Sequence, residues 1–357
     1  MSTEKDITMK RSMTYAAIGF GLLLPYLSQP ALSQTIPSAQ TNAAPAAASL
    51  GGLTYVAWKG KSAPADKVWY ADSNTWGQNS ISFAVTTQAP ALTTFGSTLY
   101  LAWRGQGTGP TDEIYYSTST GAGWSSQTTV CNPGKTTCAE AAAAPALAAS
   151  SSTLYAAWTT STNTIEYAAF NGTWAFPSAQ PPAIAVPGTA PALAVFDNTL
   201  YLAWVAQGTS EVEYATMSLS SGAWSSAAST GISTSVAPAL GVYTVPTGDT
   251  GESLPSGLYM AVASGGTLSV YDWDDGWVAV RIPGLPIPPG PFTPALVNTA
   301  TICEPSGSEA STSALSLVYS YPDPGTSFDE IYVEQLSYGT GKCIIPCTPC
   351  PPASCCA

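Results

Sequence analysis

The amino-acid sequence predicts an all-β chain that folds as a β-propeller of six four-stranded blades, with seven blades as the alternative. Three observations lead to this prediction. Three short phrases recur six times in the same order, with a period of about 50 residues, which suits one blade per copy. Each phrase alternates β-branched or aromatic residues with small ones, as half-buried strands do. No long stretch of helical periodicity competes with this pattern.

The repeated unit consists of three phrases and a closing aromatic residue. The first phrase is Pro-Ala, in most copies followed by Leu, and it begins at Pro45, Pro90, Pro145, Pro191, Pro238 and Pro294. The second reads Leu-Tyr-x-Ala-Trp in its fullest form and ends at Trp58, Trp103, Trp158, Trp204, Val262 and Tyr319. The third reads Ile-x-Tyr and begins at Val68, Ile114, Ile165, Val212, Leu268 and Ile331. The closing aromatic, absent from the sixth copy, is Trp76, Trp124, Trp174, Trp224 and Trp277.

A single four-stranded unit would leave both faces and its edges open to water. Neighbouring units must therefore stack to bury their apolar side chains, and closing the ring protects the edges. Because successive side chains of a strand point to opposite faces, Tyr100 and Ala102 are expected to face one neighbouring blade. Leu99, Leu101 and Trp103 are expected to face the other.

The first 33 residues have the pattern of a secretory signal peptide. Lys10 and Arg11 precede an apolar run at 13–27, and Ala31 supplies a small residue near the cleavage point. A signal anchor is the alternative, but this run of about 15 residues falls short of the roughly 20 that span a bilayer. We therefore expect a secreted or periplasmic/extracellular protein with no membrane span in its mature form.

The rest of the chain divides into three parts. We expect a flexible leader at 34–43, the propeller over 44–342 and a Cys/Pro-rich tail over 343–357. Cys131 and Cys138 bracket a short polar loop, and an exported protein is predicted to join them in a disulfide. The spacing of the tail cysteines allows a metal cluster, but export and the absence of histidine favour a disulfide staple in the tail. The sequence leaves open how the remaining six cysteines pair: Cys303, Cys343, Cys347, Cys350, Cys355 and Cys356.

Charge and composition limit the possible functions. The formal net charge is −12, and without residues 1–33 it becomes 7 − 20 = −13, which argues against nucleic acid or anionic lipid as a partner. The absence of histidine excludes Ser-His-Asp and Cys-His catalysis and a His-ligated zinc site. No cofactor or metal is expected. Carboxylate pairs could serve a glycoside hydrolase, but most precede the third phrase, as turn residues would: Asp112-Glu113, Glu211 with Glu213, Asp272 to Asp275, and Asp329-Glu330.

Two resemblances add to this picture. The order of motifs in the repeat is similar to that of the PLL-like bacterial propeller lectins, which bind fucose and related sugars. These motifs are Ala-Pro-Ala-Leu, Leu-Tyr-Leu-Ala-Trp-Arg-Gly, Ile-Tyr-Tyr and Gly-x-Trp. More distantly, the turns at 117–124 and 218–224 resemble the Asp-box turns of sialidase-like propellers. Catalytic sialidases carry three arginines that bind the substrate carboxylate, whereas Arg104 and Arg281 are the only arginines after residue 33. An active sialidase is therefore not expected.

The sequence thus predicts a secreted, non-catalytic carbohydrate-binding propeller whose partner is a glycan or glycoconjugate. A protein-interaction scaffold is the alternative, and a glycoside hydrolase-like enzyme is the third possibility. The candidate sugar-binding residues combine aromatic rings with basic donors: Trp58, Lys59, Trp103, Arg104, Tyr116 and Trp124. If Arg104 instead forms an ion pair with Asp112 or Glu113, it belongs to the scaffold.

Overall fold

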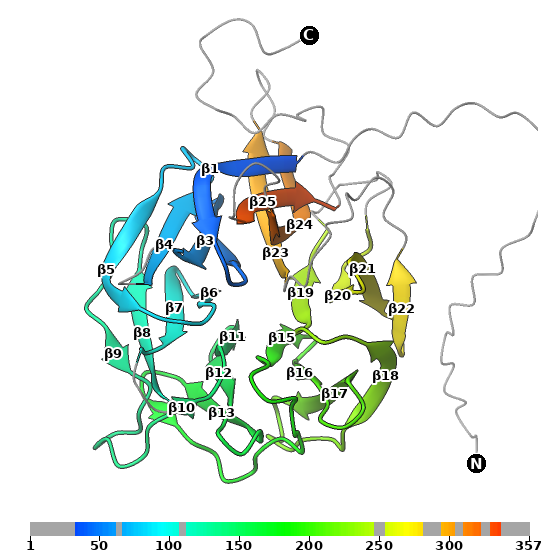
Figure 1. Cartoon of the computed structure of the whole chain (residues 1–357). Coiled ribbons are helices and arrows are strands. Elements are labelled where there is room, and N and C mark those ends of the chain that lie inside the picture. The colour runs from blue at the N-terminus through cyan, green and yellow to red at the C-terminus, as the bar shows by residue number, and fades with distance from the viewer. Residues whose placement is uncertain are drawn as a thin grey trace, which may run out of the picture.

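The computed structural model describes residues 33–61, 66–106, 112–245, 254–280, 294–303, 310–322 and 329–336. These residues form strands, turns and loops, arranged as six antiparallel sheets around a central axis (Figure 1). The prediction of six blades is confirmed. Within these ranges, no helix has the length and apolar character needed to cross a membrane. The expected signal peptide, apart from Ser33, and the cysteine-rich tail lie outside the described residues.

The first three blades follow the chain in order. Blade 1 comprises β2 (Ala46–Leu50), β3 (Leu53–Lys59), β4 (Lys67–Asp72) and β5 (Asn79–Val85). Blade 2 comprises β6 (Ala91–Phe95), β7 (Thr98–Arg104) and β8 (Asp112–Ser119), with β9 (Thr128–Thr129) and β10 (Glu140–Ala141) both paired to β8. Blade 3 comprises β11 (Ala146–Ala149), β12 (Leu154–Thr159), β13 (Ile165–Phe170) and β14 (Trp174–Ala175).

The next two blades repeat this order from the axis outward. Blade 4 comprises β15 (Ala192–Phe196), β16 (Thr199–Val205), β17 (Glu211–Ser218) and β18 (Ala228–Ser233). Blade 5 comprises β19 (Ala239–Tyr243), β20 (Gly257–Ser264), β21 (Thr267–Trp273) and β22 (Trp277–Val280). In each blade the first phrase forms the innermost strand, the second phrase the next strand, and the third phrase the strand after it.

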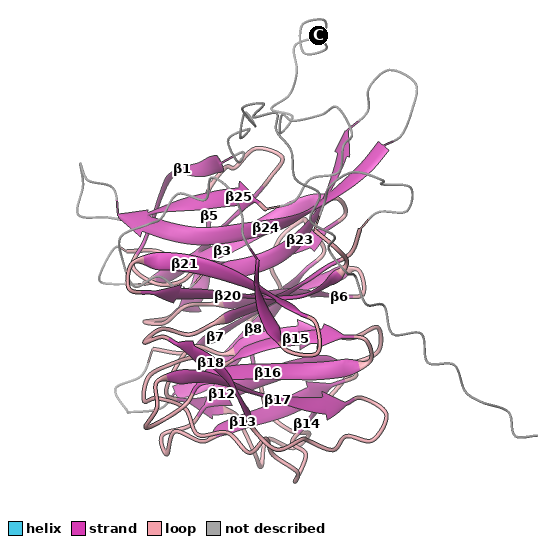
Figure 2. Cartoon of the chain, turned by 90° about the vertical axis from the view of Figure 1, so that its right-hand side faces the viewer, coloured by secondary structure: helices cyan, strands magenta, loops and turns pink. Residues whose placement is uncertain are grey.

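Blade 6 joins the two ends of the described chain. It comprises β23 (Ala295–Cys303), β24 (Ala310–Pro322) and β25 (Asp329–Gln335), and its fourth strand is β1 (Ser33–Thr41). Both views show β1 alongside β25 (Figures 1 and 2). The prediction of a flexible leader at 34–43 is therefore wrong. The physical reason is ring closure: β1 takes the place of the fourth strand of blade 6 and covers the edge that β25 would otherwise leave open.

The core consists of one apolar cluster between each pair of neighbouring blades. Leu99, Leu101 and Trp103 pack toward blade 1, whereas Tyr100 and Ala102 pack toward blade 3. This is the alternation expected from the sequence. The large residue at the end of the second phrase is fully buried in four blades, as Trp58, Trp103, Trp158 and Trp204.

The six innermost strands surround a central channel with a volume of about 390 Å³. Its wall is built mainly from Pro, Ala and Leu of the first phrase. Hydroxyl groups link the inner strands where the ring closes: Ser49 donates a hydrogen bond to the Asn298 carbonyl, and Thr94 donates one of 2.6 Å to the Ser49 carbonyl. These contacts join blade 6 to blade 1 and blade 1 to blade 2.

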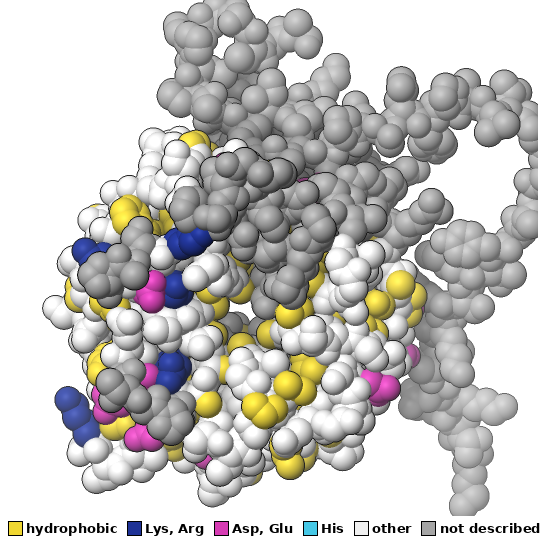
Figure 3. Space-filling view, viewed as in Figure 1, with side chains coloured by type: hydrophobic (Ala, Val, Ile, Leu, Met, Phe, Trp, Pro, Cys, Tyr) yellow, Lys and Arg dark blue, Asp and Glu magenta, His cyan; other side chains and the backbone are white. Residues whose placement is uncertain are grey.

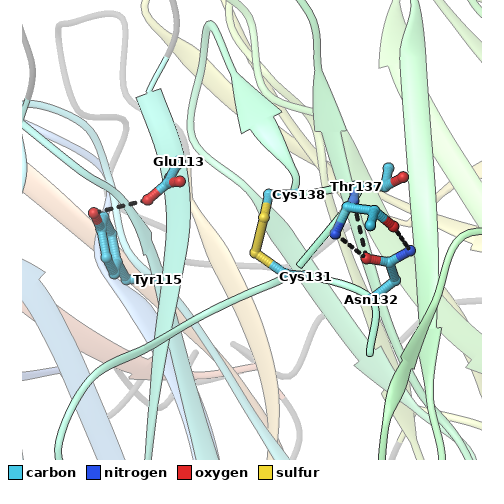
Figure 4. Close-up of a disulfide and its surroundings, with 7 residues drawn as sticks. Glu113, Tyr115, Cys131, Asn132, Thr137 and Cys138 are labelled. Atoms are coloured by element: carbon cyan, nitrogen blue, oxygen red, sulfur yellow. Dashed lines mark hydrogen bonds between the residues drawn. A yellow bond between two sulfur atoms is a disulfide. The ribbon is translucent and has the colours of Figure 1, made fainter. Parts of the chain in front are cut away.

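The predicted disulfide between Cys131 and Cys138 is present (Figure 4). It closes the loop between β9 and β10, and Asn132 Oδ1 accepts hydrogen bonds from the backbone N–H groups of Thr136 and Thr137 in the same loop. After this loop the chain continues into β10, which pairs with the start of β8. The bridge therefore stabilises an extra edge strand that belongs only to blade 2 among the described blades.

Candidate functional site

The two basic residues predicted to bind sugar are instead held in ion pairs. Arg104 Nη2 lies 2.9 Å from Asp112 Oδ2, and Arg104 Nε donates a 2.8 Å hydrogen bond to the Ala141 carbonyl. In blade 1, Lys59 Nζ lies 3.1 Å from an Asp66 carboxylate oxygen. Arg104 is 7% exposed and Lys59 is 3% exposed. Both residues therefore belong to the scaffold, and their assignment as sugar ligands is corrected.

The glycine after each basic residue also has a structural role. The N–H of Gly105 donates a 2.9 Å hydrogen bond to the Glu113 carbonyl, which continues the pairing of β7 with β8. A Cβ atom at Gly105 would lie 2.8 Å from Cε2 of the Tyr115 ring. At Gly60 a Cβ atom would collide with the Trp69 ring. The Lys/Arg-Gly pattern thus reflects the close approach of an aromatic ring to the backbone.

Trp58 and Trp103 are each only 1% exposed. The Trp103 ring stacks against Tyr115, with 6.1 Å between ring centroids and 23° between ring planes. Neither tryptophan presents a face on which a sugar could stack. Their assignment as sugar-binding residues is therefore also corrected, and the reason is that the alternation of β3 and β7 directs both rings into the spaces between blades.

The closing tryptophans pack edge-on against a tyrosine of the preceding blade. Four successive interfaces repeat this contact, with centroid distances of 5.3 to 6.2 Å and interplanar angles of 74° to 85°: Tyr70–Trp124, Tyr116–Trp174, Tyr167–Trp224 and Tyr214–Trp277. The Nε1 atom of each of these tryptophans is buried and has no hydrogen-bond partner. Trp124, a predicted sugar ligand, is thus one of a series of interface residues and is half-buried.

Tyr116, the remaining predicted sugar ligand, belongs to a cluster of four aromatic rings between blades 2 and 3. The other members are Tyr100, Phe170 and Trp174. Phe170 has a central position in this 2–3 cluster, since its ring centroid lies 5.9 Å from Tyr100, 6.4 Å from Tyr116 and 5.2 Å from Trp174. Trp174 is buried, whereas the other three rings are partly exposed.

An equivalent 4–5 cluster lies between blades 4 and 5 and consists of Tyr201, Tyr214, Trp273 and Trp277. Trp273 occupies the central position, 5.7 Å from Tyr201, 5.2 Å from Tyr214 and 5.2 Å from Trp277. All three contacts are edge-on, with interplanar angles of 65° to 71°. Tyr201 is 8% exposed and the other rings are partly exposed. Trp273 thus corresponds to Phe170, position for position.

The central ring distinguishes these two interfaces from their neighbours. At the interface of blades 1 and 2 the corresponding residue is Ser119, which is 6% exposed. At the interface of blades 3 and 4 it is Met217, which is 3% exposed. Because each of these interfaces keeps its tyrosine and tryptophan pair, the ring at Phe170 or Trp273 is an addition to a contact that already joins the blades.

Two polar turns adjoin the strands of each cluster, and the two pairs of turns differ in charge. Ser97 and Asn171 lie beside the 2–3 cluster, in the turn before β7 and the turn after β13. The same two turns beside the 4–5 cluster carry Asp197 and the pair Asp274-Asp275. Asp197 and Asp275 have positive φ angles of 44° and 53°, which suit the tight turns that Asp and Asn favour. All five side chains are exposed.

The charged turn before β16 raises the pKa of a tyrosine in the 4–5 cluster. Burial raises the pKa of the Tyr201 hydroxyl, and the negative charge of Asp197 raises it further. Asp272 lies on the opposite face of β21, near Tyr259 at the interface with blade 6; burial raises the pKa of its carboxyl, and a backbone hydrogen bond at Trp273 opposes this in part. In the 2–3 cluster, burial raises the pKa of Tyr100, and the other contribution comes from Tyr116. Of the two clusters, only the 4–5 cluster therefore has a tyrosine whose pKa is raised by a neighbouring carboxylate.

Positive charge is concentrated on blades 1 and 2 of the described chain, where Figure 3 shows dark blue side chains with acidic ones beside them. The described Lys and Arg residues are Lys59, Lys61, Lys67, Arg104 and Lys135. Over the same ranges, no three Cys, Asp or Glu side chains come together as metal ligands. The described residues of blades 4 and 5 thus include no Lys or Arg that could neutralise the carboxylates of the 4–5 cluster.

Comparison with known proteins identifies the fold. No protein-family model and no curated protein matches this sequence. Among solved structures, AofleA from Arthrobotrys oligospora matches with a TM-score of 0.53 at 12% identity, over 87% of this chain and 94% of that one. The sialidase of Trypanosoma rangeli matches with a TM-score of 0.51 at 9% identity, over 83% of this chain and 55% of that one. The chain shares their propeller fold.

A third similar structure is the fucose-specific lectin from Aleuria aurantia, with a TM-score of 0.49 at 14% identity, over 84% of this chain and 96% of that one. The chain thus spans about half the length of the sialidase but nearly the whole length of the Arthrobotrys and Aleuria proteins. At these identities the similarity concerns the fold, and the role of individual residues must come from the chain itself.

Proposed function

We propose that this protein is a secreted, non-catalytic carbohydrate-binding propeller. The observation that carries the proposal is the pair of equivalent aromatic clusters, in which Phe170 and Trp273 add a partly exposed ring to an interface that packs without one elsewhere. The apolar face of a pyranose stacks on such a ring, while nearby polar groups hold its hydroxyls. A fucose residue or a related neutral sugar suits the 2–3 cluster because its methyl group adds apolar surface.

The polar turns provide the hydrogen-bonding groups that such a site needs. Ser97 offers a hydroxyl, and Asn171 offers an amide that can both donate and accept. On the 4–5 cluster, the Asp197, Asp274 and Asp275 carboxylates accept hydrogen bonds from sugar hydroxyls. Two weak sites on one rigid ring would bind a multivalent glycan more tightly than either site alone.

A catalytic role has less support than binding. Arg104 is the only arginine in the described part of the chain. Because it forms an ion pair with Asp112, it is not available to bind a substrate carboxylate as the arginines of a sialidase do. The absence of histidine removes the commonest general base. The resemblance to fucose-binding propeller lectins supports the same conclusion.

Export is the second part of the proposal. A disulfide between Cys131 and Cys138 persists in an oxidising compartment such as the periplasm or the extracellular space. The pattern of residues 1–33 is typical of a signal peptide. A glycan on a cell surface or in the surrounding medium is therefore the partner that we propose.

The experiment is a glycan array with the exported protein, followed by thermal denaturation with each glycan that binds. A ligand at about 100 times its Kd stabilises the native state by about 2.7 kcal/mol, so a true ligand should raise the Tm measurably. Phe170→Met should reduce binding of neutral glycans while retaining the fold, because Met217 fills the same position elsewhere. An array without a single bound glycan would favour the interaction scaffold and overturn the proposal.

A further inference from the structure

The two aromatic clusters are alike in geometry but unlike in charge. Four ring contacts recur in each: the central ring with both tyrosines and with the tryptophan, and the second tyrosine with that tryptophan. The turn after the central ring has the same length in blades 3 and 5. Asn171 in the first corresponds to Asp274 in the second. The chain therefore contains two versions of one site that differ in their carboxylates.

The carboxylates of the 4–5 cluster carry a net negative charge. Asp274 and Asp275 are exposed, and neither has an ion-pair partner in the described chain. Asp272, which precedes the central ring, lies on the opposite face of β21, near Tyr259 at the interface with blade 6, and takes no part in the 4–5 cluster. A cluster of acidic residues alone would indicate only solubility. Here, however, Asp274 and Asp275 directly follow Trp273, whose indole is partly exposed, and an indole face also attracts cations.

We propose that the 4–5 cluster binds glycans that carry a free, protonated amine, whereas the 2–3 cluster binds neutral sugars. This inference rests on the proposed carbohydrate-binding function. A hexosamine has both an apolar ring face, which stacks on Trp273, and an ammonium group, which pairs with Asp274 or Asp275 and lies near aromatic faces. N-acetylation removes the positive charge and hence the preference. Sialic and uronic acids are excluded from the 4–5 cluster by repulsion between carboxylates.

The test compares chitobiose that lacks acetyl groups with N,N′-diacetylchitobiose by titration calorimetry at about pH 6, where the amine is protonated. The disulfide-bonded wild-type protein should bind the amine form about tenfold more tightly, from the sum of a cation–π contact and exposed charge pairs. Because exposed charges are screened by salt, this preference should decrease between about 0.05 and 0.5 M NaCl. Sialyllactose should show no binding at the 4–5 cluster.

Two variants make the inference falsifiable. The double variant Asp274→Asn, Asp275→Asn should lose the amine preference while retaining its Tm, since Asn also accepts the positive φ of Asp275. In the opposite direction, Asn171→Asp should give the 2–3 cluster a preference for the amine form. Equal binding of both disaccharides by the wild type, or an unchanged preference in the double variant, would overturn the inference without affecting the proposed function. Failure to bind any glycan would overturn both.

Discussion

Arg104 Nη2 lies 2.9 Å from Asp112 Oδ2, and the two side chains are 9% and 12% exposed. Removing one partner of a buried pair leaves the other charge without compensation. Arg104→Ala should therefore reduce the free energy of unfolding by about 3 kcal/mol, as measured by urea denaturation. Glycan affinity should not change, since Arg104 lies at the opposite end of β7 from the turn that carries Ser97, and its side chain contacts Asp112 and Ala141. A loss of affinity with unchanged stability would restore Arg104 as a ligand.

The approach of the Tyr115 ring to Gly105 gives a second prediction. Gly105→Ala should destabilise the protein by about 1 to 3 kcal/mol, because the added methyl group would lie 2.8 Å from Cε2 of Tyr115. Gly276→Ala is the control, since no atom lies within 4 Å of the Cβ position there. The two variants should differ clearly in their urea midpoints, and equal midpoints would contradict the close packing at Gly105.

Glu334 in β25 predicts a dependence of stability on pH. Its side chain is 1% exposed, Oε1 has no partner, and Oε2 accepts a 3.1 Å hydrogen bond from the Tyr319 hydroxyl. Burial raises its pKa above the ordinary value of 4.5, and the Tyr319 hydrogen bond opposes this in part. The native state therefore keeps a proton that the unfolded chain releases. The free energy of unfolding must then fall as pH rises from about 4.5 through the raised native pKa.

Glu334→Gln should remove this contribution to the pH dependence. The variant should have a higher Tm than the wild type at neutral pH, and the difference should disappear near pH 4, below both pKa values. The exposed residue Glu166 provides the control, since Glu166→Gln should follow the wild-type profile. A Tm difference that stays constant across this pH range would show that packing, rather than ionisation, distinguishes the variant.

The disulfide leads to a local prediction. Cys131 and Cys138 are separated by 7 positions, and closing so short a loop stabilises the native state by about 2 kcal/mol in the chain-entropy model. The double variant Cys131→Ser, Cys138→Ser should lose about this amount and become more sensitive to proteases between β9 and β10. Cleavage elsewhere at the same rate would indicate that the bridge stabilises more than this loop.

Much of the architecture could be predicted from the sequence because each copy of the repeat predicts the same strands in the same order. The alternation around Trp103 predicted which side chains face each neighbouring blade, and the short polar loop between Cys131 and Cys138 predicted the disulfide. The strand β1 was not predicted because its partner β25 lies near the other end of the chain. Pro37 and several small polar residues also make that segment look unstructured, although Ile36 is 1% exposed.

The candidate site was harder to predict, for two physical reasons. A basic residue at a strand end is equally compatible with a ligand contact and an ion pair, and only the position of Asp112 distinguishes them. The aromatic clusters form between blades, from phrases of two successive copies, so no continuous motif contains them. The available signal was Phe170 and Trp273, the aromatic residues at the end of the third strand in blades 3 and 5, where blades 2 and 4 have Ser119 and Met217.

The most direct test of the carbohydrate-binding proposal is calorimetric titration of the wild type and of the double variant Phe170→Met, Trp273→Met with the best glycan from the array. Removing the stacking ring from each cluster should weaken binding about tenfold or more, since an aromatic contact contributes about 0.5 to 1.5 kcal/mol beyond its buried area. Met217→Leu should bind like the wild type. Unchanged affinity in the double variant, with the fold intact by circular dichroism, would contradict the proposed sites.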